Sequence, residues 1–131
     1  MKTNTLMAGA IALSLSLGAT PAFAANWVYV GESVSNAVWY YDSDSLQRSG
    51  DEVTVWKKLD HSRDQTTKIR TALVRTRYDC AERTDTLLAR VSYFPDGTSN
   101  SAEWSRYEQT ADTIFPESMA EAMLKAVCGL D

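Results

Sequence analysis

The amino-acid sequence predicts an α+β fold, in which an antiparallel sheet of about six strands carries a C-terminal helix on one face, tied to it by a disulfide. Between Ile69 and Phe94, apolar and polar residues alternate with a period of two, which is typical of strands that bury one face. The segment MAEAMLKAVC near the C-terminus has helical periodicity instead. The two cysteines of the chain, Cys80 and Cys128, lie at the end of the first long strand and in this helix, so we expect a disulfide between them.

Residues 1–24 have the pattern of a cleaved signal peptide. Lys2 provides a positive charge, an apolar run follows from Leu6 to Leu17, and Ala22-Phe23-Ala24 has small residues where signal peptidase cuts. The run is too short and too rich in Ser and Gly for a membrane-spanning helix, although an uncleaved signal anchor is the alternative. We expect one domain, residues 25–131, that is soluble after export and has no lipid anchor, because no cysteine lies near the cleavage site.

Composition limits the class of partner and the compartment. The chain has 13 basic and 17 acidic residues, and its formal net charge is −4. An acidic chain without a basic run argues against a nucleic-acid partner. Two cysteines, both outside the signal peptide, fit an oxidising compartment. These features favour a periplasmic, extracellular or cell-surface location.

Six segments have the aromatic and β-branched content of strands. They are residues 27–30, 37–41, 52–61, 71–80, 87–93 and 99–108. Phe94-Pro95-Asp96-Gly97-Thr98 predicts a chain reversal between the last two, because Pro presets φ and Gly accepts a positive φ. Since no helical pattern intervenes between the segments, we expect a mainly antiparallel sheet.

The C-terminal helix has a clear start. Ser118 and Glu121 have the spacing of a capping box, in which each side chain satisfies a free backbone donor at the first turn. Glu121 and Lys125 have the spacing of an ion pair on the solvent side. The apolar stripe expected to face the sheet comprises Met119, Ala122, Met123, Ala126 and Val127.

Several short motifs occur in a recognisable order along residues 27–128. They are Trp27, Tyr41-Asp42, Ser45-Leu46, Arg48, Gly50, Val53-Thr54-Val55-Trp56, Tyr78-Asp79-Cys80, Leu124 and Ala126-Val127-Cys128. This ordered set resembles the surface-adhesin protein E family of small exported bacterial proteins. The resemblance implies a six-stranded antiparallel sheet with a disulfide-tied C-terminal helix. It also implies a role in binding host matrix proteins such as vitronectin and laminin.

Residues with catalytic or metal-binding chemistry are few. His61 is the only histidine, and no nucleophile motif such as G-x-S-x-G accompanies it. Asp42-x-Asp44 resembles the start of a calcium loop, but Leu46 and Gln47 stand where an acceptor and a glycine are needed. We therefore expect neither an enzyme, nor a metal site, nor a cofactor.

One face of the sheet is the candidate binding site. Strict alternation would place Val53, Val55 and Leu59, and then Leu87, Ala89, Val91 and Tyr93, on the apolar face. The opposite face would carry Trp56, Lys58, Arg75, Arg77 and Arg90. This basic, partly aromatic surface could engage an acidic protein segment or a polyanion. The alternative is an ordinary solvated face balanced by Asp60, Asp79 and Asp85.

Two functions of different class are compatible with these patterns. One is an adhesin-like protein that contacts a host matrix protein. The other is a soluble periplasmic accessory protein, either an inhibitor of an exported hydrolase or an envelope-assembly factor. Fold alone does not separate them. Open edge strands would also allow a homodimer.

Overall fold

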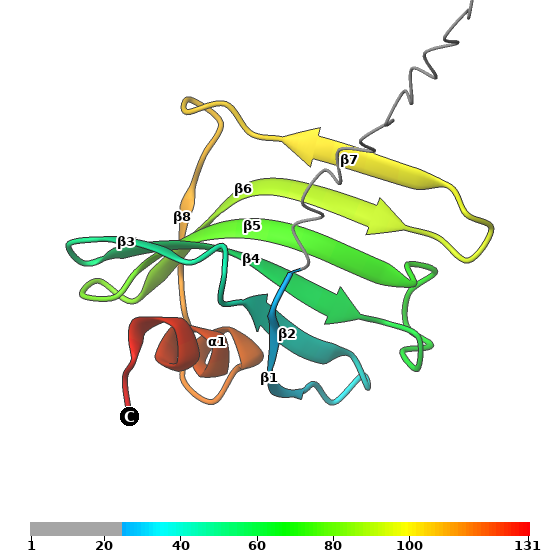
Figure 1. Cartoon of the computed structure of the whole chain (residues 1–131), viewed down its shortest axis with the longest axis horizontal. Helices are drawn as coiled ribbons and strands as arrows, with labels where there is room; N and C mark the ends of the chain where they lie inside the picture. Colours follow the sequence, from blue (N-terminus) through cyan, green and yellow to red (C-terminus); the bar gives the residue numbers. More distant parts are fainter. Residues whose placement is uncertain (1–24) are drawn as a thin grey trace, which may run out of the picture.

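The computed structural model describes residues 25–131, so the predicted signal peptide, residues 1–24, lies outside the described residues. One helix lies against a twisted, eight-stranded sheet (Figure 1). The elements in chain order are β1 (Trp27–Glu32), β2 (Val38–Asp42), β3 (Gln47–Ser49), β4 (Glu52–Asp60), β5 (Thr71–Asp79), β6 (Thr84–Tyr93), β7 (Ser99–Glu103), β8 (Ala111–Thr113) and α1 (Met119–Cys128). None of the helices formed by residues 25–131 has the length and apolarity needed to cross a membrane.

The sheet confirms the predicted architecture and adds two short strands. Six strands follow one another in the order β1-β2-β4-β5-β6-β7, and every pair is antiparallel. The three-residue strand β3 also pairs with β4, and the three-residue strand β8 pairs with β6. The predicted last strand, residues 99–108, therefore ends early at Glu103, and a loop of residues 104–110 leads to β8.

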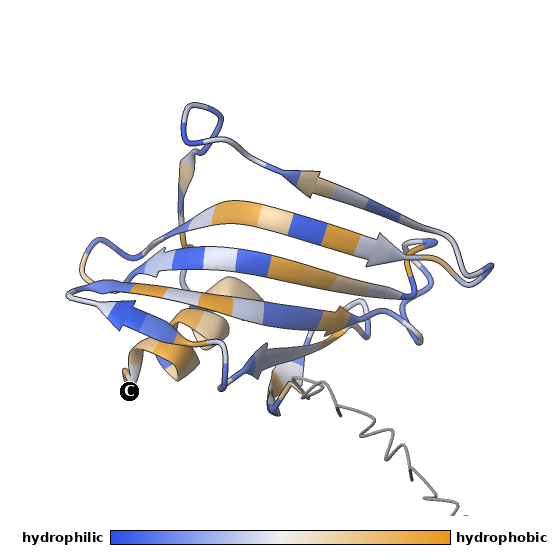
Figure 2. Cartoon of the chain, turned by 45° about the horizontal axis from the view of Figure 1, so that its top comes forward, coloured by the Kyte–Doolittle hydropathy of each residue, from blue (hydrophilic) through white to orange (hydrophobic). Residues whose placement is uncertain are grey.

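Alternation along the long strands separates an inner face, which contacts α1, from an outer face on the other side. Bands of hydrophilic and hydrophobic residues follow one another along these strands (Figure 2). The inner face of β4 and β5 carries Val53, Val55 and Tyr78, each at most 1 % exposed. Met123 and Leu124 of α1 complete this core and are 0 % exposed. Burial of these side chains is the main force that holds the helix to the sheet.

The helix packs closely at its first turn. A Cβ added to Gly31 of β1 would lie 3.2 Å from the terminal methyl carbon of Met119, so this strand has a glycine where the helix crosses it. The predicted apolar stripe is wrong in one respect. Leu124 is buried and Ala126 is exposed, because the buried side of the helix is centred on Met123 and Val127.

The start of the helix matches the predicted cap, with a change in the reciprocal bond. The side chain of Ser118 accepts a hydrogen bond from the Glu121 backbone N–H at 3.1 Å. The carboxylate of Glu121 reaches one residue further back than expected and accepts from the Glu117 N–H at 3.3 Å. It also pairs with Lys125 at 3.4 Å and with Arg83 at 3.0 Å. This carboxylate thereby joins the helix to the β5–β6 turn.

Replacing Ser118 by alanine should lower the free energy of unfolding by about 1 kcal/mol, because the first turn loses its side-chain acceptor. Urea unfolding of the oxidised and the reduced protein measures the change. Ser99→Ala on the exposed strand β7 is the matched control and should stay within about 0.5 kcal/mol of the parent. Equal unfolding midpoints for Ser118→Ala and the parent in both redox states would show that Ser118 is not the cap.

The predicted disulfide is present. Cys80 follows the last residue of β5, Cys128 is the last residue of α1, and their Cα atoms lie 5.9 Å apart. The bond joins positions 48 residues apart in sequence and fixes the C-terminal end of the helix to the end of the central strand β5.

The alternation predicted for β6 is wrong in part, because the strand contains a bulge. Thr76 pairs with Leu87 and Arg75 with Ala89, so Leu88 is the extra residue. A one-residue shift moves all following side chains to the other face. Leu87 therefore lies on the inner face as predicted, but Ala89, Val91 and Tyr93 lie on the outer face.

Candidate binding face

Four of the five predicted site residues lie together on the outer face of the sheet. They are Trp56, Lys58, Arg75 and Arg77. The register pairs Trp56 directly with Arg75, and residues paired in this way project to the same side of a sheet. Arg75 is exposed and the other three are half-buried, so their functional groups are accessible on one surface.

The placement of Arg90 on this face is wrong. The bulge at Leu88 pairs Arg90 with Val74, whose side chain is on the inner face. Arg90 therefore lies on the opposite side of the sheet from Arg75. Its exposed side chain belongs to a different surface of the molecule and is removed from the candidate site.

Aromatic side chains surround Lys58 at the β1–β2 end of the outer face. The Lys58 ammonium lies 4.5 Å from the ring centroid of Tyr40 and 4.8 Å from that of Trp27. Tyr29 packs edge-on against Tyr40 with ring centroids 6.0 Å apart, and it is exposed. Cation–π contacts of this kind hold the lysine in place without neutralising its charge. The Trp27-x-Tyr29 alternation was the sequence signal for this cluster.

A groove lies at the other end of the outer face, beside the bulge. It has a volume of about 420 Å³ and is lined by Trp56, Arg75, Arg77, Trp104 and Gln109, among others. The Trp104 backbone N–H donates to the Leu88 carbonyl at 3.0 Å, which fixes the loop of residues 104–110 to the bulged residue. Sequence patterns did not identify Trp104 or Gln109, because their position depends on β7 and β8 both pairing with β6.

The cations of the outer face have no carboxylate partner in the described part of the chain. Within residues 25–131, no Asp or Glu oxygen lies within 4.0 Å of the charged nitrogens of Lys58, Arg75 or Arg77. Within residues 25–131, the three aspartates considered as balancing charges form no ion pair with these cations, although Asp60 lies near enough to Lys58 for the two charges to attract. Asp79 accepts from the backbone N–H groups of the following turn. Asp85 lies opposite Tyr78 in the pairing of β5 with β6, and therefore on the inner face. Asp60 accepts from the Ser62 N–H, and this bond is the main reason that its pKa is lowered.

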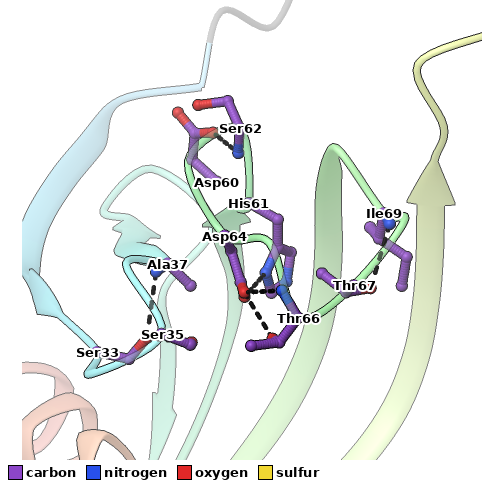
Figure 3. Close-up of polar contacts among 10 residues, drawn as sticks. All are labelled: Ser33, Ser35, Ala37, Asp60, His61, Ser62, Asp64, Thr66, Thr67 and Ile69. Atoms are coloured by element: carbon purple, nitrogen blue, oxygen red, sulfur yellow. Dashed lines mark hydrogen bonds and ion pairs between the residues drawn. The ribbon is translucent and has the colours of Figure 1, made fainter.

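Polar side chains hydrogen-bond to one another within the loop between β4 and β5 (Figure 3). Asp64, whose side chain is 3 % exposed, accepts from the Thr66 hydroxyl at 2.6 Å and from the Thr66 N–H at 2.9 Å. His61 Nδ1 lies 2.9 Å from the other carboxylate oxygen and donates to it. These bonds, with those of Thr66 first, lower the pKa of Asp64 to about 2. Asp64 is therefore ionised at neutral pH and rigidifies the loop.

This loop borders an open depression of about 860 Å³ at the end of the sheet. His61, Lys68 and Arg70 line it on one side, and Phe94 of the β6–β7 turn lines it on the other. Asp64 orients the imidazole, but a general base also needs a reacting group within hydrogen-bond reach. In the described residues, the imidazole of His61 makes no hydrogen bond other than that to Asp64. No three His, Cys, Asp or Glu side chains of residues 25–131 are grouped so as to hold a metal ion.

A buried lysine on the inner face is unexpected from the sequence. Lys57 is 8 % exposed, and its ammonium donates to the Tyr78 hydroxyl at 3.3 Å. The ammonium also lies 5.4 Å from the Trp39 ring centroid and 5.7 Å from that of Tyr78. Burial lowers the pKa of Lys57, and nearby Asp85 offsets this in part. In the sequence, Lys57 stands between Val55 and Leu59 in the alternation of apolar residues, and this spacing already indicates that its side chain lies on the inner face.

Comparison with known proteins identifies the fold. Crystal form II of Haemophilus influenzae protein E is similar over 77 % of this chain and 87 % of its own, with 16 % identity and a TM-score of 0.53. A second structure of Haemophilus influenzae protein E is similar over 79 % of this chain and 83 % of its own, with 14 % identity and a TM-score of 0.54. At this level of identity the likeness concerns the fold alone. No curated protein sequence matches the chain.

The sequence itself gives the stronger assignment. The model of the family described as surface-adhesin protein E matches residues 27–129, which include every strand of the sheet and the whole helix. The match also includes both bonded cysteines and the four outer-face residues described above. The chain belongs to the surface-adhesin protein E family.

Proposed function

We propose that this protein is exported and acts by binding rather than by catalysis, as an adhesin that engages a host matrix protein such as vitronectin or laminin through its outer face. Membership of an adhesin family supports the general role. The observation that carries the choice of surface is the set of three cations, Lys58, Arg75 and Arg77, on one face that also carries aromatic side chains. Among residues 25–131, none of the three has a carboxylate partner within 4.0 Å. Such a surface complements an acidic segment of a partner and is available without breaking internal ion pairs.

Reversal of two charges on this face tests the proposal. Arg75→Glu/Arg77→Glu should weaken binding to immobilised vitronectin or laminin at least tenfold, because attraction becomes repulsion at the centre of the surface. Binding by the parent should also weaken as salt rises, since exposed charges are screened beyond about 8–10 Å at ordinary ionic strength. Surface plasmon resonance across a salt series measures both effects.

The matched control is Lys68→Glu/Arg90→Glu, which makes the same change in net charge away from the outer face. Circular dichroism establishes that each variant is folded. If the outer-face variant is folded and binds like the control at every salt concentration, or if the parent binds neither protein, the proposed use of this face is wrong.

Location is tested separately by fractionating cells into periplasm, outer membrane and medium. We expect the protein in the outer-membrane or medium fraction. Exclusive retention in the soluble periplasm would contradict a surface role and favour a periplasmic accessory protein.

A further inference from the structure

The groove beside the bulge has the features of a preformed binding site for a small ligand. Gln109 accepts from the Arg77 guanidinium at 3.1 Å and donates to the Trp104 carbonyl at 3.1 Å. Since the Trp104 N–H is bonded to Leu88, one continuous chain of hydrogen bonds positions an arginine and a tryptophan relative to the sheet. Bulges frequently re-aim side chains at sites of function, and groups held in this way lose little entropy on binding.

The chemistry of the lining side chains narrows the ligand class. Arg75 and Arg77 are two residues apart on one strand, so their Cα atoms are separated by about 6.6 Å and can contact separate anionic groups. Planar guanidinium groups bind carboxylate or sulfate through paired hydrogen bonds. The indole rings of Trp56 and Trp104 also line the groove and offer flat apolar surface.

Glu103 favours one of two possible classes of acidic ligand, a saccharide over a peptide. Its side chain lines the same groove and, among the described residues, has no cation within 4.0 Å. A carboxylate at this position repels any anionic group placed next to it, but it can accept hydrogen bonds from hydroxyl groups. It therefore fits a sugar, which carries hydroxyl groups between its anionic substituents, better than a peptide with an acidic side chain at every position. Indole rings also stack well on the apolar C–H face of a pyranose ring.

We propose that this groove binds an acidic saccharide unit, a sugar that carries carboxylate or sulfate groups. Arg75 and Arg77 bind the anionic substituents, Trp56 and Trp104 contact the ring faces, and Glu103 accepts from hydroxyl groups. Gln109 is a positioning residue that holds Arg77 and the Trp104 loop. The assignment rests on the proposed use of the outer face in binding, and it adds a ligand class that does not depend on a protein partner.

Calorimetric titration of the oxidised protein with a heparin-derived tetrasaccharide tests this assignment. The parent should bind this probe and should bind neutral maltotetraose at least tenfold more weakly. Trp104→Ala should weaken binding of the acidic probe at least tenfold. Gln109→Ala should weaken it several-fold although no charge changes, which separates a built site from general attraction to a basic surface. Tyr107→Ala is the matched control, because Tyr107 lies in the same loop, is 99 % exposed and does not line the groove.

Three results would overturn the assignment. These are no binding of the acidic tetrasaccharide, equal binding by Tyr107→Ala and by both groove variants, or tighter binding of a hexaglutamate peptide than of the tetrasaccharide. The last result would identify the groove as a site for acidic peptide. Failure here with retained, Arg75- and Arg77-dependent binding to vitronectin or laminin would leave the proposed function standing. Saccharide binding without binding to vitronectin or laminin would support the saccharide site and contradict the proposed function.

Discussion

Replacing Cys80 and Cys128 together by alanine should lower the free energy of unfolding by about 4 kcal/mol. The bond closes a loop between positions 48 residues apart, and the chain-entropy model assigns about 4 kcal/mol to a loop of this length. Native stability of a domain of this size is itself only about 5–15 kcal/mol, so the loss is a large fraction of the total. Alanine is preferred to serine because Cys128 is 4 % exposed and a hydroxyl there would be buried without a partner.

Urea unfolding followed by tryptophan fluorescence measures the change. The parent with its disulfide reduced is the matched control, since it keeps both sulfur atoms and loses only the cross-link. The alanine variant and the reduced parent should unfold at similar urea concentrations, both well below the oxidised parent. An unchanged midpoint in the reduced parent would show that packing of Met123 and Leu124 alone holds the helix in place.

Local signals were sufficient to predict most of the fold. Period-two alternation located the long strands, and the Ser118–Glu121 spacing located the start of the helix within one residue. The two cysteines predicted how the helix is attached to the sheet. These signals are reliable because each depends on neighbours in sequence or on a pair with no alternative partner.

The error on β6 has a physical origin in strand register. Strict alternation assumes that each residue has one partner on the neighbouring strand. At the bulge, Leu87 and Leu88 together lie opposite the single residue Thr76 of β5. The consecutive pair of leucines was the sequence signal, because it interrupts the alternation at this point. Reading it as a bulge would have placed Arg90 on the inner face.

The groove could be predicted only in part. Trp56, Arg75 and Arg77 follow from alternation on two adjacent strands. Trp104 and Gln109 join them because β7 and β8 pair with opposite halves of β6, which turns the intervening loop toward the bulge. Sequence alone does not give strand order, so residues that are positioned by the pairing of β7 and β8 with β6 could not be predicted.

Lys57→Met should raise the free energy of unfolding by about 2 kcal/mol at neutral pH. The Lys57 ammonium is nearly inaccessible to water, and no carboxylate of the described residues lies within 4.0 Å of it. Its compensating contacts are one hydrogen bond to Tyr78 and the faces of two aromatic rings. These contribute about 1–2 kcal/mol each, which offsets only part of the several kcal/mol needed to remove an ammonium group from water. Methionine retains the apolar stem and removes the charge.

The pH dependence of stability is an independent check that the buried charge of Lys57 destabilises the folded protein. Burial is the largest influence on the pKa of Lys57 and lowers it from the ordinary value of 10.5. Between the lowered pKa and 10.5, the unfolded chain binds more protons than the folded protein, so stability due to this group rises with pH. Below that window the penalty is fully present. The advantage of Lys57→Met should therefore be largest near neutral pH and should shrink as the pH approaches about 10.

Two neighbouring ionisable groups face Lys57 and set the range of the experiment. Burial raises the pKa of Tyr78, so above about pH 10 the unfolded chain loses a tyrosine proton that the folded protein keeps, and both proteins become less stable. Burial also raises the pKa of Asp85, and Lys57 partly opposes this. Denaturant unfolding between about pH 7 and 9.5 stays below the ordinary pKa of tyrosine and well above that of aspartate.

The control is Lys58→Met, one residue along the same strand. Lys58 lies on the outer face and keeps contact with solvent above Trp27 and Tyr40, so its replacement loses two cation–π contacts and should lower stability by about 1 kcal/mol, with no gain at any pH in this range. A lower stability for Lys57→Met than for the parent throughout the range would contradict the argument. It would show that the bond to Tyr78, the two ring contacts and the attraction of Asp85 together exceed the cost of burying the ammonium group.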